Sequence, residues 1–510
     1  RDIFLAPHGM EQFHLEIQNL YAALAQPTEK LTLSYPVSDS SGAEKRPSFA
    51  VGRIAHLLPE VTVEKESADK EYRLLAKDAA LEYAGEHIGG ALWQYFEGRA
   101  DAQRTLSAMR AASRMTRGGL SKNAVRALYG DTLRLSASQM DKARACHFAY
   151  FLRYGLRAKE RTGAGFDAPQ IGTFVHDVME HTLRAAKARG GLHTLEKAEL
   201  HALVQEAIAD YKTRVLPDLS EKSARFRYLF DRLCDSTERI MDEVADELKH
   251  SDFEPVAFEL AFGPNGQLPA VTVCEKGNTA RVVGKVDRVD GWEHGGKLYL
   301  RVVDYKTGKK TFDLAELRYG LGLQMLLYLF ALEQEGGALF GGKEIVPAGV
   351  LYTPAREPML RCARNTADET IEKARKKELR RSGMVLEDPA VLEAMEHDAL
   401  DAPEYLPIAV KKGGALSGSL ASEGQFAKLA KYVDRVLREI ADEVFAGNIN
   451  ADPYARTPQQ SACTYCEFAS ACHFENGRGG DHMEYIKATK TDEFWSYIDE
   501  VNGEGGRKNG

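Results

Sequence analysis

The sequence predicts an α/β protein in which a central mixed sheet is flanked by helices. Three segments are typical of strands, because apolar and polar residues alternate or apolar residues run together over short lengths, at 258–262, 279–289 and 298–305. Longer stretches with helical spacing precede and follow them, at about 170–189 and 321–333. Strands interleaved with helices favour a sheet covered by helices.

Length and composition favour several globular domains. The chain has 510 residues, of which 44% are hydrophobic and 28% charged, and its net charge is −8. Disorder requires low hydrophobicity together with a large net charge, and this chain has neither. No apolar run approaches the roughly 20 residues of a membrane span, and no secretory signal precedes the first apolar residues. We therefore expect a soluble, cytoplasmic protein without membrane contact, and a fragment or processed piece because it begins with Arg rather than Met.

Three parts are expected along the chain. Residues 1–134 combine short apolar runs with a helical pattern. Residues 135–480 hold the predicted sheet, with a strongly charged helical insertion at about 190–250. Residues 481–510 end in NGEGGRKNG and are expected to be a partly disordered tail.

A basic region lies before the predicted sheet. Between residues 101 and 162 there are 13 Lys or Arg against 4 Asp or Glu. Binding to phosphates requires only a local basic surface, because counterions are released at the contact. A solvated helical face is the alternative. Within the aromatic and Arg-rich stretch at 135–161, we expect Arg144, Tyr150 and Arg153 to contact single-stranded DNA.

Carboxylates and a lysine gather at one predicted hairpin. Asp287 is expected at the end of one strand, and Asp304 and Lys306 near the end of the next, with GWEHGG at 291–296 as the turn. Asp304 and Lys306 leave their strand on one face, since strand side chains alternate. Carboxylates and a backbone carbonyl are ligands for Mg²⁺ or Mn²⁺, and a lysine beside them can stabilise charge at a phosphate. The arrangement predicts phosphodiester hydrolysis; an ordinary hairpin with exposed charges is the alternative.

Two helices and one strand offer further polar groups. Gln324 and Tyr328 lie at i and i+4, so both can face the strand ends and contact a DNA phosphate. His176 is a candidate metal ligand on the helix at 170–189, and Glu259 is another in FELAFG. A core helix, a structural histidine and a surface glutamate are the alternatives.

Five blocks together resemble a known family. IGTFVH, FELAF, GKVDRVD, VVDYKTG and LQMLLY are similar, in this order, to blocks of RecB-type nucleases of the PD-(D/E)XK superfamily. The resemblance implies that superfamily's α/β fold and a metal-dependent deoxyribonuclease acting as an exonuclease. It implies a catalytic set of Asp287, Asp304, Lys306, Gln324 and Tyr328, with His176, Asp287, Asp304 and Glu259 holding Mg²⁺ or Mn²⁺.

Three of the seven cysteines form a C-x2-C-x5-C motif at Cys463, Cys466 and Cys472. A metal site of thiolates needs four ligands, so one must come from elsewhere, and Cys146 in ACHFAYFLRYGL is the candidate. Three clustered thiolates and one distant thiolate are compatible with an iron–sulfur cluster; a zinc knuckle is the alternative, and His147 is a competing ligand.

The cysteine pattern is similar to that of AddB-type subunits of helicase–nucleases, which carry one cysteine before the nuclease blocks and three after. This resemblance implies a [4Fe–4S] cluster that joins the two ends of the nuclease domain. It implies that residues 1–134 are the α/β end of an inactivated helicase-like region with a helical linker. It further implies an AddA-type partner that unwinds DNA, and cleavage of the 5′-terminated strand at single-stranded ends during double-strand break repair.

Two other functions stay open at this point. One is a DNA-binding structural subunit whose nuclease site is silent in isolation. The other is a stand-alone iron–sulfur exonuclease of the CRISPR-associated kind, in which the first 130 residues are hard to place.

Overall fold

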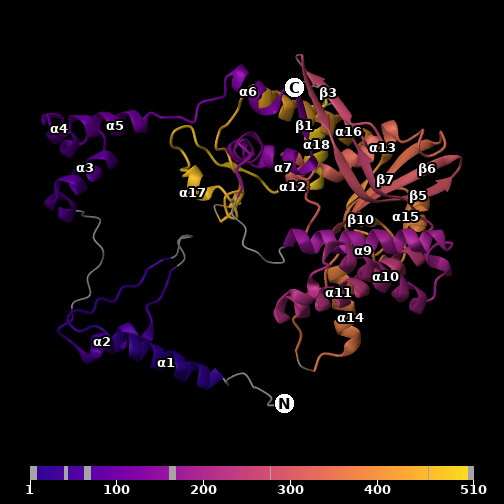
Figure 1. The fold of residues 1–510 in the computed structure, drawn as a ribbon, viewed down its shortest axis with the longest axis horizontal. Coiled ribbons are helices and arrows are strands. Elements are labelled where there is room, and N and C mark those ends of the chain that lie inside the picture. The colour runs from indigo at the N-terminus through magenta and orange to yellow at the C-terminus, as the bar shows by residue number, and fades with distance from the viewer. Residues whose placement is uncertain are drawn as a thin grey trace. The chain divides into compact units, whose positions relative to one another are not determined.

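The computed structural model describes residues 9–38, 44–61, 71–159, 168–275, 277–363, 365–457 and 459–503. The chain divides into two compact units, Arg1–Ala112 and Ser113–Gly510 (Figure 1). This division comes earlier in the sequence than the boundary expected after residue 134. Most of the predicted disordered end, residues 504–510, lies outside the described residues.

The first unit is helical in its described residues. Its α-helices are α1 (Gly9–Ala25), α2 (Phe49–Leu57), α3 (Lys77–Glu86), α4 (Ala91–Glu97) and α5 (Gln103–Ser113). A small core forms where Trp93, Phe96 and Leu106 pack together. The described part of this unit contains one isolated β-bridge, between Ser38 and Glu44, so the expected α/β character is not seen there.

The second unit is built on a six-stranded mixed sheet with the order β11-β8-β7-β6-β5-β2. The strands are β2 (Glu254–Phe262), β5 (Gly284–His294), β6 (Lys297–Lys306), β7 (Glu344–Pro354), β8 (Ser382–Leu386) and β11 (Leu420–Ala421). β6 and β7 are parallel, whereas β5 pairs antiparallel with both β2 and β6. The predicted mixed sheet is therefore confirmed.

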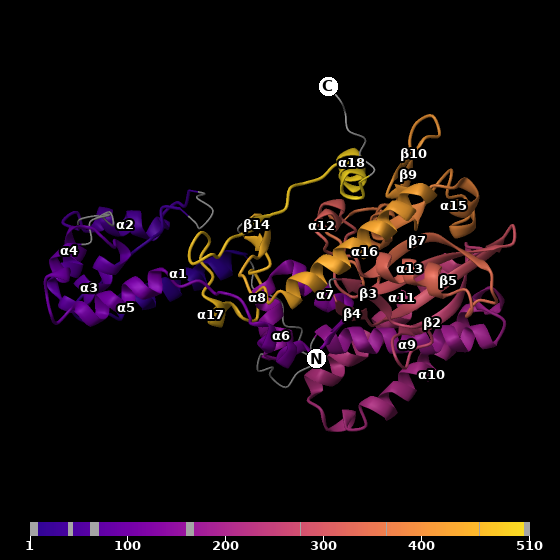
Figure 2. The ribbon, with the colours of Figure 1, turned by 90° about the horizontal axis from the view of Figure 1, so that it is seen from above.

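Helices cover this sheet on two sides. Figure 2 shows α9 (Ala168–Ala188) and α10 (Lys197–Val215) on one side, and α13 (Gln324–Glu335) and α16 (Glu423–Phe445) on the other. α11 (Ala224–Lys249) packs on α9 and α10, in the segment where a helical insertion was predicted. In the described part of the chain, no helix combines the length and apolar character that crossing a membrane requires.

The predicted strand at 279–289 is in fact two strands in two sheets. β4 (Asn278–Val282) lies between β3 (Val271–Glu275) and β1 (Thr132–Leu135) in a small separate sheet. β5 begins only after Val283, whose N–H donates to the Leu135 carbonyl at 2.9 Å. The continuous apolar alternation does not reveal this break, because both halves face a core.

Several other elements differ from the sequence-based expectation. The charged segment before Phe445 contains β8, with α14 (Asp368–Leu379) and α15 (Pro389–Met395) around it, and β8 is not among the strands predicted from the sequence. β8 has five residues and follows the strongly charged α14, and a segment of this length is too short for a clear strand pattern. The expected tail contains α18 (Thr491–Val501), where Phe494 and Ile498 are fully buried.

Two groups of short strands complete the second unit. β9 (Ile408–Val410) pairs with β10 (Leu416–Gly418), and β12 (Tyr454–Thr457) lies between β13 (Gln460–Ser461) and β14 (Glu484–Tyr485). The second of these small sheets flanks the cysteine segment, so the thiols lie outside the central sheet.

Candidate active site

The β5–β6 hairpin brings the predicted carboxylates to one edge of the sheet. β5 runs on to His294, and the chain turns at Gly295 and Gly296, the last two residues of the predicted turn. Asp287 therefore lies near the beginning of β5, not at its end. Because the two strands are antiparallel, the beginning of β5 faces the end of β6, where Asp304 and Lys306 lie.

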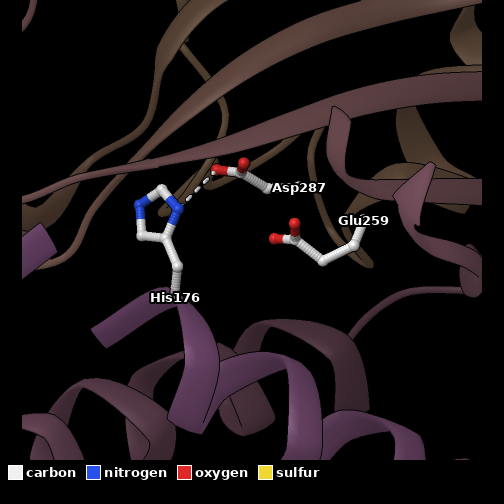
Figure 3. A group of neighbouring side chains, drawn as sticks. All are labelled: His176, Glu259 and Asp287. Atoms are coloured by element: carbon white, nitrogen blue, oxygen red, sulfur yellow. Dashed lines mark ion pairs between the residues drawn. The ribbon is translucent and has the colours of Figure 1, made fainter. Parts of the chain in front are cut away.

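Three potential metal ligands converge at this edge from three elements. His176 comes from α9, Glu259 from β2 and Asp287 from β5 (Figure 3). One ligand atom of each lies within 4.8 Å of those of the other two, and these three form the one such group among the described residues. His176 Nδ1 is 3.3 Å from Asp287 Oδ2.

The backbone at Glu259 is unusual for a strand. Its φ is +48°, in the left-handed region that costs a non-glycine residue about 1–3 kcal/mol. The ladder pairs on either side, Phe258 with Arg288 and Leu260 with Val286, hold this conformation. Lys285 forms an ion pair with Glu259. Burial raises the pKa of Glu259, and Lys285 only partly opposes this shift.

The peptide groups of Tyr305 hold two of these ligands. Its N–H donates to Asp287 Oδ2 at 3.1 Å, and its carbonyl accepts from His176 Nε2 at 2.7 Å. Burial disfavours the charged imidazole, but the carboxylate of Asp287 and the Tyr305 carbonyl outweigh it and raise the pKa of His176. The carbonyl between Asp304 and Lys306 is thus at the site.

Asp304 and Lys306 form an ion pair beside this group. Asp304 is 5% exposed, and Lys306 Nζ lies 2.6 Å from its Oδ2. Burial and the negative charge of Asp287 raise the pKa of Asp304 to about 6, against the opposing effect of Lys306. A divalent cation at this edge would favour the ionised carboxylate, because opposite charge stabilises it.

The donor set fits Mg²⁺ or Mn²⁺. Carboxylate oxygens of Glu259, Asp287 and Asp304, together with the Tyr305 carbonyl, are the hard donors that these ions take. The imidazole of His176 is compatible with Mn²⁺ and can complete the ligand set of this site. The carboxylates of this donor set lie close together and repel one another. A cation bound between them would offset this repulsion.

Tyr328 supports the strand edge from the side of α13. It is 5% exposed, and its ring stacks on Phe262 with centroids 5.6 Å apart. A Cβ on Gly284 would lie 2.2 Å from the Tyr328 hydroxyl oxygen, which explains the glycine that begins GKVDRVD. Contact between the Tyr328 hydroxyl and a DNA phosphate stays a prediction. Gln324, in the first turn of α13, is half-buried and remains a predicted contact.

Of the three residues predicted to contact DNA, Tyr150 is buried, Arg144 is mostly buried, and Arg153 is exposed. Tyr150 is 3% exposed and stacks on Tyr129, so its ring offers no face to a base and that prediction is wrong. Arg144 is paired with two carboxylates of α16, and Arg153 with Glu467. Both guanidinium groups are already neutralised within the unit.

Cys146 reaches the distant cysteine segment. It lies at the break between α7 (Ala137–Ala145) and α8 (His147–Tyr150), in extended conformation. It packs with Phe468 and Cys466 in a small apolar cluster. Among the described residues, no three cysteine sulfurs lie within 4.8 Å of one another. A single zinc ion with Zn–S bonds of about 2.3 Å needs them closer than this.

His147 is not available as a thiol-site ligand. Its Nδ1 lies 2.6 Å from Asp452 and its Nε2 3.2 Å from Glu443. Burial opposes the charge, but these two carboxylates outweigh it and raise the pKa of His147 to about 9. The backbone N–H of His147 also donates to Asp452 at 2.9 Å, which holds the chain extended at Cys146.

Arg117 also connects this region, and sequence reasoning missed it. Its guanidinium makes two 2.7 Å contacts with Asp481, donates to the Cys472 carbonyl at 2.8 Å and lies over the ring of Phe148. No motif marks this residue in the sequence. Only the packing of segments far apart in the chain identifies it.

A family model for the PD-(D/E)XK nuclease superfamily matches residues 134–473. The chain belongs to the PD-(D/E)XK nuclease superfamily. The matched segment contains the converging carboxylates, the lysine and all four cysteines considered above. The superfamily predicted from the five sequence blocks is therefore confirmed.

Several proteins named as the B-type component of an ATP-dependent helicase/deoxyribonuclease are similar to the chain. Those of Acetivibrio thermocellus, Ruminiclostridium cellulolyticum and Thermoanaerobacter pseudethanolicus are 31%, 30% and 29% identical over 504, 510 and 513 residues. The alignments cover 94–95% of this chain and 44% of each relative. The chain thus spans less than half the length of these relatives. The predicted resemblance to AddB-type subunits is confirmed by this similarity.

Proposed function

We propose that this chain is the Mg²⁺- or Mn²⁺-dependent DNA exonuclease module of a helicase–nuclease. The single observation that carries the proposal is the convergence of His176, Glu259 and Asp287 beside Asp304 and Lys306, in a chain of this superfamily. The names of the relatives, which combine helicase and deoxyribonuclease, support DNA as the substrate.

The residues of the site have two roles, binding of the cation and stabilisation of charge on the phosphate. Glu259, Asp287, Asp304 and the Tyr305 carbonyl would hold the cation, with His176 beside them. When bound, the cation would polarise a phosphoryl oxygen and lower the pKa of a water molecule. Lys306 adds positive charge next to the scissile phosphate, where negative charge grows during hydrolysis.

The biological setting follows from the similarity to AddB-type subunits. We propose that an AddA-type partner unwinds duplex DNA and delivers single-stranded ends, and that this module cuts the 5′-terminated strand. The process would belong to recombinational repair of double-strand breaks in the cytoplasm.

The test compares Asp287→Ala with Asp210→Ala, an exposed aspartate of α10 paired with Arg214 on its own helix. With Mg²⁺ and labelled single-stranded DNA, Asp287→Ala should lower the cleavage rate by about 100-fold or more, since even outer changes at metal sites cost about 10- to 100-fold. Asp210→Ala should cleave like the wild type. DNA binding without divalent ions should be unchanged in both.

Equal cleavage by the wild type and Asp287→Ala would refute the site. Absence of cleavage by every protein, with and without the unwinding partner, would favour the alternative of a DNA-binding subunit with a silent site.

We further propose that Cys146, Cys463, Cys466 and Cys472 hold a [4Fe–4S] cluster. Support comes from the packing of Cys146 with Cys466 and Phe468, which are separated from it by most of the sequence of the unit. Further support comes from the distances between the sulfur atoms, which are longer than coordination of one zinc ion requires. Four thiolates would fit a cubane. Iron, sulfide and zinc analysis of anaerobically purified protein should find about four iron and four sulfide per chain, and stoichiometric zinc instead would refute the cluster.

A further inference from the structure

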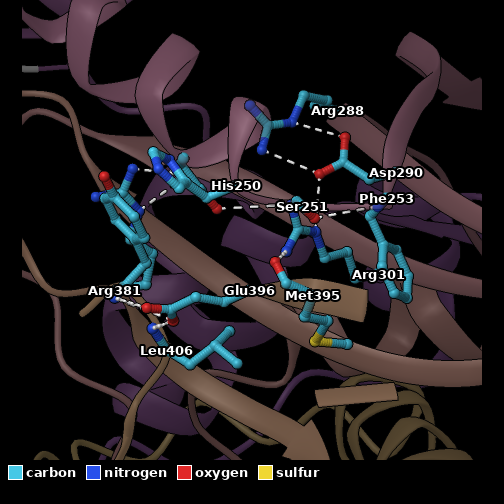
Figure 4. A network of polar contacts seen from close by, with 12 residues as sticks. His250, Ser251, Phe253, Arg288, Asp290, Arg301, Arg381, Met395, Glu396 and Leu406 are labelled. Carbon is cyan, nitrogen blue, oxygen red and sulfur yellow. Dashed lines mark hydrogen bonds and ion pairs between the residues drawn. The ribbon is translucent and has the colours of Figure 1, made fainter. Parts of the chain in front are cut away.

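The sequence block GKVDRVD contains charged residues that the metal centre does not use. Arg288 and Asp290 follow Asp287 on β5, and both are fully buried, as is Arg301 of β6 (Figure 4). Burying charged groups is unfavourable unless they are paired and hydrogen-bonded. Contacts within the protein must therefore compensate for burying these three charged side chains beside the site.

These residues form one buried network. Arg288 Nε lies 2.8 Å from Asp290 Oδ1, and Arg301 Nε donates to Asp290 Oδ2 at 2.9 Å. Arg301 lies 3.6 Å from Glu247 of α11, and Glu247 also accepts from Arg381 at 2.6 Å. The network thus joins α11, β5, β6 and the residue that precedes β8.

The network ends on the side chain of Tyr305. Arg288 Nη1 donates to the Tyr305 hydroxyl at 2.7 Å, and Tyr305 is 3% exposed. Because strand side chains alternate, the Tyr305 ring leaves β6 on the face opposite to Asp304 and Lys306. All three polar groups of this residue are therefore in use, since its N–H binds Asp287 and its carbonyl accepts from the site histidine.

We propose that Arg288 and Tyr305 are positioning residues for the metal centre. The buried network holds the phenol, the phenol holds the end of β6, and the Tyr305 peptide groups hold Asp287 and His176 at the site. The inference rests on the proposed function in one respect, that these ligands serve a metal-dependent nuclease.

The physical reason is the electrostatics of the site edge. The carboxylates of Glu259 and Asp287 lie close together at the end of the sheet, and the charge of Asp287 also acts on Asp304 of β6, so their mutual repulsion tends to separate the ligands. A hydrogen bond from a buried guanidinium fixes the strand from the other face. Groups that orient metal ligands in this way usually change metal affinity or activity about 10- to 100-fold when removed.

The test removes only the hydroxyl, with Tyr305→Phe, and uses Tyr405→Phe as the matched control. Tyr405 is also buried and its hydroxyl also donates to a charged partner, Asp246. Its ring lies over Arg381 of the network, a contact that phenylalanine keeps, and its hydroxyl contacts no described ligand of the metal centre. Tyr305→Phe should raise the Mn²⁺ concentration for half-maximal cleavage of single-stranded DNA about 10-fold or more and lower kcat. KM for DNA should change less than about twofold, because no DNA contact is removed. Tyr405→Phe should leave all three values unchanged.

A second measurement needs neither metal nor activity. Hydrogen exchange at the amide of position 305, which donates to Asp287, should become faster in Tyr305→Phe than in the wild type and stay unchanged in Tyr405→Phe. Wild-type Mn²⁺ dependence together with wild-type exchange in Tyr305→Phe would overturn the inference. A lower Tm in both variants without any change in Mn²⁺ dependence would also overturn the inference, because the Tyr305 hydroxyl would then only stabilise the fold. If the wild type and Asp287→Ala cleave equally, the proposed function fails, whereas the exchange result still decides the positioning role.

Discussion

The carboxylate edge and the cysteine segment, both parts of the second unit, are organised in different ways. At the edge, one helix and two strands of the central sheet place three ligand atoms within 4.8 Å. In the cysteine segment, Cys146 approaches Cys466 within a small apolar cluster, while no three sulfurs reach that distance among the described residues. The fold alone thus brings the potential ligands together at the carboxylate edge, but it does not bring three sulfur atoms equally close in the described cysteine segment.

The difference lies in what supports each region. Strand ladders and the largest hydrophobic core of the described residues hold the carboxylates, so their positions follow from folding. The cysteines lie in short elements with little buried apolar area, joined by polar contacts such as that of Arg117 with Asp481. In such a region, binding of the ligand contributes directly to stability. We therefore expect loss of the bound group to unfold the cysteine segment but not the carboxylate edge.

The largest expected effect is that of Cys146→Ser. In the chain-entropy model for cross-links, joining residues 146 and 463 through a bound group restricts the unfolded chain by roughly 5–6 kcal/mol, an upper value. The free energy of unfolding should fall by a large part of this amount, measured by denaturant titration of the second unit. Cys234→Ser, at a buried cysteine outside this cluster, is the control for loss of a thiol. Equal losses in both variants would remove the contrast between the two regions.

A pH titration of stability should show the contribution of the buried network. Burial disfavours charge on Glu247, but Arg381, Arg301 and Arg288 outweigh it and lower the pKa of Glu247 from 4.5 to about 2. Because the folded pKa is the lower one, this stabilisation is present above pH 4.5 and is lost as the pH falls from 4.5 towards 2. In Glu247→Gln, Tm at neutral pH should fall, since buried charges lose their partner. Its Tm should then depend less on pH in that range than the wild-type Tm does. An unchanged pH profile would contradict the assigned pairing.

A medium effect is expected at the glycine that packs against Tyr328. Gly284→Ala would drive a methyl group into the Tyr328 hydroxyl, and overpacking of this kind costs about 1–3 kcal/mol. Since Gly284 begins the strand that carries Asp287, DNA cleavage should fall along with Tm. Gly284→Ala combined with Tyr328→Phe should recover part of the stability. Full stability of the single variant would show that the strand edge tolerates movement.

The smallest effect is a stabilising one on α9. Among the described residues, no atom outside the backbone of its own helix lies within 4 Å of where a Cβ on Gly172 would be, and glycine within a helix costs about 1 kcal/mol relative to alanine. Gly172→Ala should therefore raise the free energy of unfolding by up to about 1 kcal/mol, as measured by urea titration. Cleavage should stay at the wild-type level, because His176, one turn further along, keeps its contacts. Reduced cleavage would show that the α9 backbone must stay flexible.

The sequence by itself determined the chemistry-bearing residues and their approximate elements. Alternation and spacing predicted β2 and β6, and the order of five blocks identified Asp287, Asp304 and Lys306. These signals are local, since strand period and motif spacing depend on neighbours in the chain. The C-x2-C-x5-C motif was visible for the same reason.

The tertiary structure alone decided which side chains share a site and which are buried. Nothing in the sequence separated β4 from β5, placed Tyr150 and Tyr328 in the interior, or joined Arg288 to Tyr305 and Glu247. Burial and pairing depend on residues far apart in the chain, and the same arginine or tyrosine suits a surface or a core until its neighbours are known. The physical reason is that solvation and charge pairing are set by three-dimensional surroundings, whereas periodicity is set by the backbone.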